Sequence, residues 1–297
     1  MWTVILGCVY RYCGKEWSSE DIGKIRDLLR QEASASRMRL SRLVCEAFEW
    51  RGPNGKLKEM SCRVAMLKMQ RDGLIDLPAP RRKRPGSYRV VRTPDSDPEP
   101  DWVCSLRDLH DLKMVVVHRG APLRRWNELV GRHHYLSYKM LPGAQMRYFI
   151  MDGERVLGAM GFAAAAWKVA PRDNFIGWTG QERERGLHRI VGQSRFLILP
   201  WVHCRNLASK SLAMVAQRLP GDWEECYGFR PVLLETFVDT TRFQGTCYKA
   251  SNWLHVGNTK GRGKLDRYCA FSEPVKSIWL RPLSPDFRQR LKEPAAS

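Results

Sequence analysis

The fold is decided by one strongly apolar run of the chain, Ser194-Arg195-Phe196-Leu197-Ile198-Leu199-Pro200-Trp201-Val202. Apolar side chains fall on both faces of this segment, which is typical of a central strand that is covered on both sides. An amphipathic helix is expected next, over residues 207–218, because its apolar residues recur at helical spacing. These two segments predict a mixed α/β domain with the strand at its centre.

Further elements are expected on both sides of this strand. Residues 145–151 and 155–162 form a predicted hairpin, because Asp152-Gly153 between them is a strong hairpin turn. Helices are expected over residues 126–135 and 181–190. After the central pair, the pattern predicts a strand at 232–238, a short helix at 245–252 and a strand at 253–257.

The order of these elements resembles the acetyltransferase-like fold called GNAT, over residues 122–260. In that fold, a turn after the central strand holds the pyrophosphate of coenzyme A at a helix N-terminus. The family signature is Arg or Gln, two residues, Gly, one residue, then Gly or Ala, and the matching positions here are His203, Asn206 and Ala208. Because Asn206 stands where the signature has glycine, coenzyme A is not expected as a cofactor.

A separate N-terminal domain is predicted before a Pro- and acid-rich segment that starts at residue 93 and reads as an extended linker. Three helices are expected, the first capped near Ser18, then residues 40–48 and 58–71, the last with Met60, Val64, Leu67 and Met69 facing inward. Two strands at 74–77 and 87–91 complete a winged-helix pattern. The chain is therefore divided into a winged-helix-like DNA-binding domain at 1–92, a linker at 93–101, a GNAT-like domain at 102–270 and a basic C-terminal extension at 271–297.

The charge of the chain indicates a polyanionic partner. Lys and Arg total 50 and Asp and Glu 31, which gives a net charge of +19. A merely basic surface or a solvated charge run is the alternative. The predicted DNA-binding residues lie on a recognition helix, on a wing between the last two strands and on a glycine-rich tail: Lys56, Lys58, Arg63, Lys68, Arg81, Arg82, Lys83, Arg84, Lys260, Arg262 and Lys264.

Composition also bears on location. No apolar run approaches the ~18 residues of a membrane helix, and the first residues lack the basic flank of a signal peptide. Nine scattered cysteines are most simply reduced thiols. We therefore expect a cytoplasmic protein without a membrane partner.

Several long segments resemble the DruA family, which is named for a component of the Druantia anti-phage defence system. They are residues 196–202, 233–239, 245–253 and 257–264. Relatives of this family also occur with insertion sequences. The resemblance implies a role with DNA, in mobile elements or in phage defence, together with other proteins of such systems.

Two groups of residues are candidates for chemistry. Glu235 and Asp239 lie on one face of the predicted strand at 232–238 and its continuation, so the two carboxylates could hold Mg²⁺, with Asp173 as a third ligand. A structural ion pair between Glu235 and Arg195 is the alternative. Cys247 and Tyr248 follow in the next helix; the tyrosine could protonate a leaving thiolate or attack a phosphate, and ordinary packing is the alternative.

These observations predict a DNA-acting protein of mobile-element or anti-phage type. In one version it binds DNA for a partner enzyme. In the other it cleaves or joins strands with a divalent metal, and Glu235, Asp239, Tyr248 and Cys247 are the catalytic residues. The alternative function, from a different class, is an acyl-CoA-dependent N-acyltransferase of GNAT type.

Overall fold

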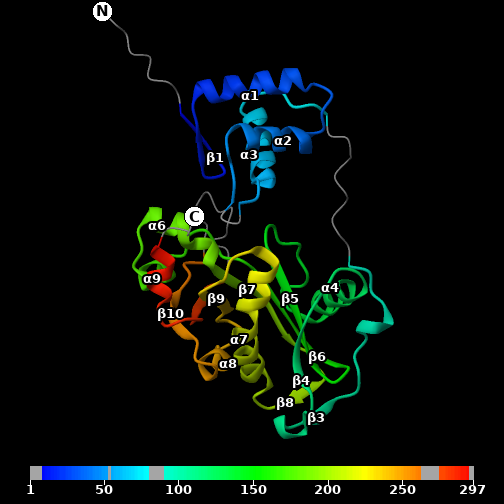
Figure 1. Cartoon of the computed structure of the whole chain (residues 1–297). Helices are drawn as coiled ribbons and strands as arrows, with labels where there is room; N and C mark the ends of the chain where they lie inside the picture. Colours follow the sequence, from blue (N-terminus) through cyan, green and yellow to red (C-terminus); the bar gives the residue numbers. More distant parts are fainter. Residues whose placement is uncertain (1–8, 53–54, 80–89, 262–273, 294–297) are drawn as a thin grey trace, which may run out of the picture. The chain divides into compact units, whose positions relative to one another are not determined.

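The structure is a computed structural model that describes residues 9–52, 55–79, 90–261 and 274–293. The chain divides into two compact units, Met1–Ser87 and Tyr88–Ser297. Each unit is described by itself, and Figure 1 labels the elements of both. Among the helices of the described residues, none has both the length and the apolar character needed to span a bilayer.

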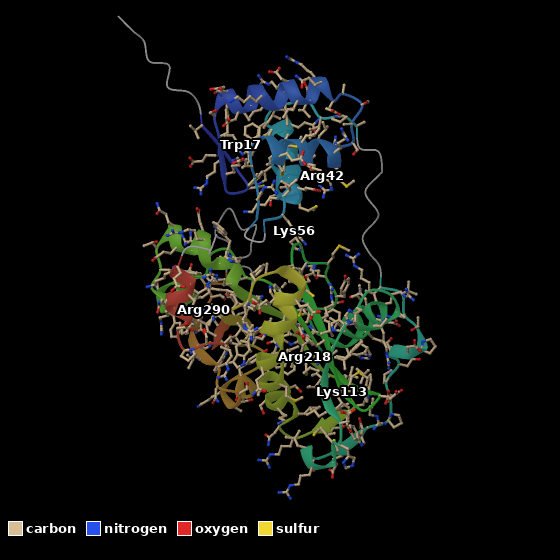
Figure 2. The ribbon with its side chains drawn as sticks, viewed as in Figure 1. Trp17, Arg42, Lys56, Lys113, Arg218 and Arg290 are labelled. Atoms are coloured by element: carbon tan, nitrogen blue, oxygen red, sulfur yellow. The ribbon has the colours of Figure 1, made fainter. Side chains whose placement is uncertain are left out.

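The first unit is a small hairpin followed by three helices. Its elements are β1 (Tyr10–Tyr12), β2 (Lys15–Trp17), α1 (Ser19–Gln31), α2 (Arg37–Ala47) and α3 (Glu59–Arg71). β1 and β2 pair antiparallel. α1 begins at a capping box, in which Ser18 accepts from the backbone of Asp21 and Asp21 accepts from that of Ser18. Trp17, labelled in Figure 2, is 1% exposed and lies at the centre of this unit's core.

The three predicted helices are present, but α3 turns a different face inward than expected. Its buried residues are Cys62, Ala65, Met66 and Met69. Of the residues expected to face inward, Met60, Val64 and Leu67 are exposed, whereas Met69 is buried as expected. Apolar residues occur at helical spacing on both faces of α3, so periodicity could not choose between them; packing against α2 and the hairpin decides it.

The strand pattern of a winged helix is not confirmed. Residues 74–77 form no strand, and Val90 and Val91 have no strand conformation either. In the described part of this unit β1 and β2 are the only strands, and they precede α1. The predicted wing, Arg81–Arg84, lies outside the described residues.

The second unit holds the large sheet. Its strands are β3 (Trp102–Cys104), β4 (Leu112–Val116), β5 (Gln145–Asp152), β6 (Arg155–Ala164), β7 (Ile190–Ile198), β8 (Val202–Cys204), β9 (Leu233–Asp239), β10 (Leu254–Asn258) and β11 (Lys276–Pro282). Its α-helices are α4 (Ala121–His133), α5 (Ala170–Ile176), α6 (Gly180–Gly186), α7 (Leu207–Tyr227), α8 (Thr246–Ala250) and α9 (Phe287–Lys292). Three 3-10 turns complete it: η1 (Pro94–Ser96), η2 (Leu106–Asp108) and η3 (Leu187–Arg189).

Seven strands form one mixed sheet in the order β10-β11-β9-β7-β6-β5-β4. All neighbours in it are antiparallel except β7 and β9, which are parallel. The parallel pair needs a crossover, and α7 supplies it between β8 and β9. β3 and β8 form a separate parallel pair. This arrangement confirms the predicted α/β class and the predicted central strand.

The two faces of the sheet are covered by different helices. Strand β9 alternates: Leu234 packs in one core cluster with Leu219 and Trp223 of α7, while Leu233 packs in another with Leu291 of α9. Arg218 of α7 donates to the carbonyl of Met114 in β4 at 2.9 Å (Figure 2). This bond and the apolar contacts hold α7 against its face of the sheet.

Two segments differ from their sequence-based expectations. The segment at 93–101, expected to be an extended linker, contains η1, and Thr93 and Ser96 both donate to the carboxylate of Glu128 in α4. The extension expected from residue 271 contains β11, which lies between β9 and β10 in the sheet. Ile278 and Leu280 of β11 are fully buried, because a strand in the interior of a covered sheet contributes to its core.

Candidate active site

The sheet opens between β7 and β9. These strands pair over four residues each, from Ile190 with Leu233 to Gln193 with Thr236. Beyond this last pair, β7 continues to Ile198 beside β6 alone, and β9 continues to Asp239 beside β11 alone, as far as the described residues show. The two strands therefore diverge, and the edge of β7 from Ser194 onward has no strand partner on that side.

Tyr248 of α8 lies at the point of divergence. Its hydroxyl donates to Gln193 Oε1 at 2.9 Å, and its ring contacts that of Phe196 in the unpaired part of β7. The side chain is 7% exposed. Burial raises the pKa of Tyr248 above its usual range, so the phenol stays protonated and can act as a proton donor.

Gln193 also has a donor without a partner. Its side chain is 6% exposed, and Nε2 has no hydrogen-bond partner among the described residues. Buried polar atoms are rarely left unsatisfied in folded proteins. An N–H donor thus lies buried beside the Tyr248 hydroxyl, where it could bind a carbonyl oxygen.

His134 and Tyr135, which follow α4, approach the same part of β7. His134 Nδ1 accepts from the backbone N–H of Leu136 at 3.1 Å, and the ring also bonds to the backbone of Phe196. Burial, with the nearby positive charge of Arg195, lowers the pKa of His134 from 6.5 to about 4. The imidazole is therefore neutral at pH 7 and ties the end of α4 to β7.

The chain after β7 leads to the N-terminus of α7. Asn206, the residue before the helix, has φ +66° and provides no side-chain cap. The first N–H groups of a helix have no partner within it, so they can bind an anion. Asn206 occupies the position that is glycine in the GNAT signature, and asparagine tolerates this left-handed conformation better than most residues do. The departure from the signature therefore preserves the backbone shape.

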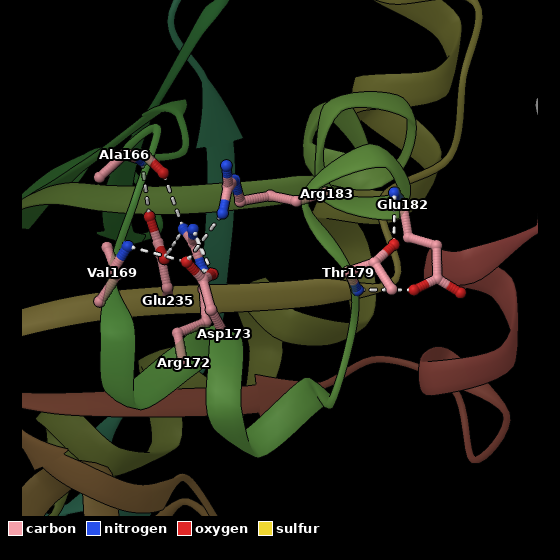
Figure 3. Close-up of polar contacts among 8 residues, drawn as sticks. All are labelled: Ala166, Val169, Arg172, Asp173, Thr179, Glu182, Arg183 and Glu235. Atoms are coloured by element: carbon pink, nitrogen blue, oxygen red, sulfur yellow. Dashed lines mark hydrogen bonds and ion pairs between the residues drawn. The ribbon is translucent and has the colours of Figure 1, made fainter.

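The predicted metal ligands do not form a metal site (Figure 3). Glu235 is 1% exposed; its carboxylate accepts from Ala166 N and from Arg172 Nη1, both at 2.8 Å. Asp173 accepts from Arg172 Nη2 at 2.8 Å. Asp239 accepts from the hydroxyl of Thr241 at 2.7 Å. In the described part of the chain, no group of three or more His, Cys, Asp or Glu side chains could hold a metal ion.

Glu235 is therefore part of a buried ion pair, as the structural alternative had it, but with a different partner. The expected partner Arg195 donates to the carbonyls of Ser137 and Ser194 instead. The observed partner Arg172, on α5, is fully buried. Sequence reasoning missed it because nothing in the local pattern around Ala170-Pro171-Arg172 indicates that this arginine points into the core.

The other predicted site residues are placed as follows. Cys247 neighbours Tyr248 in α8, and burial raises the pKa of its thiol, which disfavours the nucleophilic thiolate. Lys58 precedes α3, and Arg63 and Lys68 lie on it, with Lys56 shortly before. Lys260 follows β10 in the second unit. Lys56, Lys58, Arg63 and Lys68 thus belong to the first unit and Lys260 to the second. The remaining residues, Arg81, Arg82, Lys83, Arg84, Arg262 and Lys264, lie outside the described residues.

Solved structures of N-acetyltransferases are similar to this chain in fold. One is the aminoglycoside acetyltransferase AAC(6')-Ib in complex with coenzyme A, with 13% identity, 61% of this chain and 100% of that chain covered, and a TM-score of 0.39. Another is the ribosomal-protein-S18-alanine N-acetyltransferase from Escherichia coli, with 8% identity, coverages of 58% and 95%, and a TM-score of 0.35. A third is an N-acetyltransferase from Staphylococcus aureus, with 15% identity, coverages of 47% and 68%, and a TM-score of 0.30. No protein with a curated description matches the chain.

The strand order and the divergence of β7 from β9 define the second unit as a GNAT-like domain. A family model described as Druantia protein DruA matches residues 68–292. The chain belongs to this DruA family, and both resemblances drawn from the sequence are confirmed.

Two predictions are corrected. The main function predicted from the sequence, a DNA-acting protein with a divalent metal, is wrong: Glu235 is held by Arg172, and the described residues hold no group of three or more His, Cys, Asp or Glu side chains that could bind the metal. The cofactor prediction, Mg²⁺ rather than coenzyme A, is wrong as well. No cluster of Mg²⁺ ligands forms among the described residues, and Asn206 keeps the left-handed turn that the missing glycine would have supplied.

Proposed function

We propose that the second unit is an acyl-CoA-dependent N-acyltransferase. The observation that carries this proposal is the arrangement at the strand divergence. There a buried phenol and an unpartnered buried amide, from Tyr248 and Gln193, lie beside the unpaired edge of β7. The chain then continues from β7 to the uncapped N-terminus of α7.

Each part has a chemical role in this proposal. The first N–H groups of α7 bind the pyrophosphate of the donor, because the helix dipole and unpaired N–H groups favour a negative charge there. Gln193 Nε2 donates to a carbonyl oxygen of the donor. Acyl-CoA supplies a thioester from which an amine can take the acyl group. Tyr248 delivers its proton to the departing sulfur, which is the role of a general acid, and the proton that the amine loses on acylation restores the phenol.

The role of Tyr248 is tested with Tyr248→Phe, which keeps the ring and removes the hydroxyl. Transfer, measured as release of free thiol from acetyl-CoA with a panel of amines, should fall by about 10²–10⁴-fold. The affinity for acetyl-CoA in isothermal titration should stay within about twofold, since the phenol donates a proton and does not hold the donor. An unchanged rate would remove Tyr248 from the mechanism.

The donor site is tested in the first turn of α7. Ser209→Asp places a carboxylate where the pyrophosphate is expected, and it should weaken binding of acetyl-CoA by about tenfold or more. The same carboxylate favours the helix itself, so the melting temperature should not fall. Ser209→Asn, of nearly equal size and neutral, is the matched control and should bind normally. If the unchanged protein does not bind acetyl-CoA, the proposal fails.

Family membership adds a biological setting. The name of the matching family model refers to Druantia, and we expect from it a role in antiviral defence or with a mobile element. That role, a cytoplasmic location and the identity of any partner, nucleic acid or protein, stay predictions.

A further inference from the structure

A shallow pocket lies on the other face of the sheet from α7. It is open to solvent, encloses only about 10 Å³, and is lined by residues of α4, β5, β6 and β7 and by the segment after α4. Tyr148 of β5 donates to Asp222 of α7 at 2.9 Å, so it points toward α7. Arg147, the preceding residue of the strand, points to the opposite face, because side chains alternate along a strand. Arg147 lines the pocket.

The pocket is rich in positive charge. Three of its lining residues are cations, Lys139, Arg147 and Arg195, and none is an aspartate or glutamate. Neither arginine takes part in an ion pair with any described residue. A concave site lined by one sign of charge attracts ligands of the opposite sign.

Both arginines are held in place and keep unused donors. The guanidinium of Arg147 lies over the ring of Trp126, 5.3 Å from its centroid, and Nη2 donates to Gln145 Oε1. Arg195 donates from Nε and Nη1 to backbone carbonyls. Arg147 Nε and Nη1 and Arg195 Nη2 have no hydrogen-bond partner among the described residues. Burial lowers the pKa of Arg195, as expected for a cation without a neighbouring carboxylate.

The pocket adjoins the divergence of the strands. Ser194 and Arg195 belong to the part of β7 that has no partner in β9, and Phe196, which contacts Tyr248, is the next residue. A molecule in this pocket could therefore reach β7 from the face opposite α7, where the donor is expected. The pocket is too shallow to enclose a ligand, so it can only contact one anionic group at its open side while the rest of the ligand stays in solvent.

We propose that this pocket binds the anionic group, a carboxylate or a phosphate, of the amine that accepts the acyl chain. This inference rests on the proposed function and names its substrate class. Guanidinium groups with free N–H donors match carboxylate and phosphate oxygens in charge and geometry. The same charges repel polycationic amines, so the pocket selects against them.

The test measures binding of two small amines to the full chain in the presence of saturating coenzyme A. L-Glutamate carries the carboxylate and glucosamine 6-phosphate carries the phosphate, while 1,5-diaminopentane and glucosamine are the cationic controls that lack the anion. Isothermal titration should detect binding of at least one anionic amine. The protein should bind that amine at least about tenfold more tightly than its cationic control. Binding of L-glutamate would identify the anion as a carboxylate, and binding of glucosamine 6-phosphate would identify it as a phosphate. If neither binds more tightly than its control, the proposal is overturned.

Variants locate the site. Arg147→Gln and, separately, Arg195→Gln should raise the dissociation constant of the bound anionic amine by about tenfold or more, since each removes a charge-assisted hydrogen bond. Arg155→Gln is the matched control, because Arg155 also lies over a tryptophan, Trp102, but outside the pocket. It should bind the amine normally. An equal loss of affinity for the anionic amine in Arg155→Gln, or no loss of affinity in Arg147→Gln, would overturn the proposal.

Coenzyme A affinity separates this inference from the proposed function. The pocket variants should bind coenzyme A as the unchanged protein does, because the donor is expected on the α7 side. Loss of anion binding with normal coenzyme A binding supports the inference. Failure of the unchanged protein to bind coenzyme A counts against the proposed function, and binding of the anionic amines is then still measured without it.

Discussion

Replacing Glu235 with glutamine should destabilise the second unit strongly. The carboxylate is 1% exposed and the guanidinium of Arg172 is fully buried, so neither charge can be solvated when the other is removed. Glutamine keeps the size, but its amide NH₂ would face one of two donors, Ala166 N or Arg172 Nη1, and one bond at 2.8 Å would be lost.

The expected cost follows from these contacts. Removing one partner of a buried ion pair costs about 3–5 kcal/mol, and the lower end applies because Asp173 still pairs with Arg172 at 2.8 Å. For a unit of this size, about 3 kcal/mol corresponds to a fall of about 6–12 °C in melting temperature. Thermal unfolding followed by circular dichroism measures it.

The matched control is Glu224→Gln. Glu224 pairs with Arg230 at the same 2.8 Å, but both side chains are nearly half exposed. Surface pairs contribute about 0–1 kcal/mol, so this variant should melt within about 4 °C of the unchanged protein. Equal melting temperatures for the two variants would refute the reasoning that burial makes the Glu235 pair important.

Three further predictions test other parts of the structure. Because burial lowers the pKa of His134 from 6.5 to about 4, the unfolded chain binds a proton in this range that the folded protein does not. The free energy of unfolding should therefore fall by about 3 kcal/mol as the pH drops from about 6.5 to about 4. In His134→Gln, the free energy of unfolding measured with urea should depend less steeply on pH, and an unchanged pH dependence would assign the effect to another group. Asn206→Ala should lower the free energy of unfolding in urea by about 1 kcal/mol, since alanine tolerates φ +66° poorly, whereas Asn206→Gly should leave it unchanged. An equal loss of stability in both variants would contradict a conformational role of Asn206. Leu280→Ala should cost about 2–5 kcal/mol because Leu280 is fully buried in β11, while exposed Val275→Ala should cost under about 0.5 kcal/mol; a small loss in Leu280→Ala would show that β11 is dispensable.

The sequence was most informative where a local pattern has one physical solution. The apolar run at 194–202 predicts a covered strand, and its first five residues lie in β7, although the strand ends at Ile198 and a turn follows at Pro200 and Trp201. Asp152-Gly153 fits a tight turn, so β5 and β6 were expected within a few residues of their observed positions. Tyr248 was a candidate from its place in a helix after a predicted strand, and the structure places its hydroxyl at the divergence. These features depend on neighbours in the chain, which the sequence displays.

Contacts between distant segments could not be obtained in this way. The partner of Glu235 is Arg172, 63 positions away, and many arginines satisfy the same charge requirement. The inner face of α3 was chosen by its packing, because both faces carry apolar residues. The insertion of β11 between β9 and β10 depends on pairing between distant segments, and no signal near residues 276–282 predicts it.

The sequence by itself thus determined the central strand, the hairpin before it, the helix after it and the family, since periodicity, turn residues and long matching segments are properties of the chain. Tertiary structure decided that Glu235 balances a buried arginine and holds no metal, that β7 and β9 diverge beside Tyr248, and that Arg147 and Arg195 face one pocket. The physical reason is that burial, pairing and charge compensation depend on which distant groups meet, and only the folded chain brings them together.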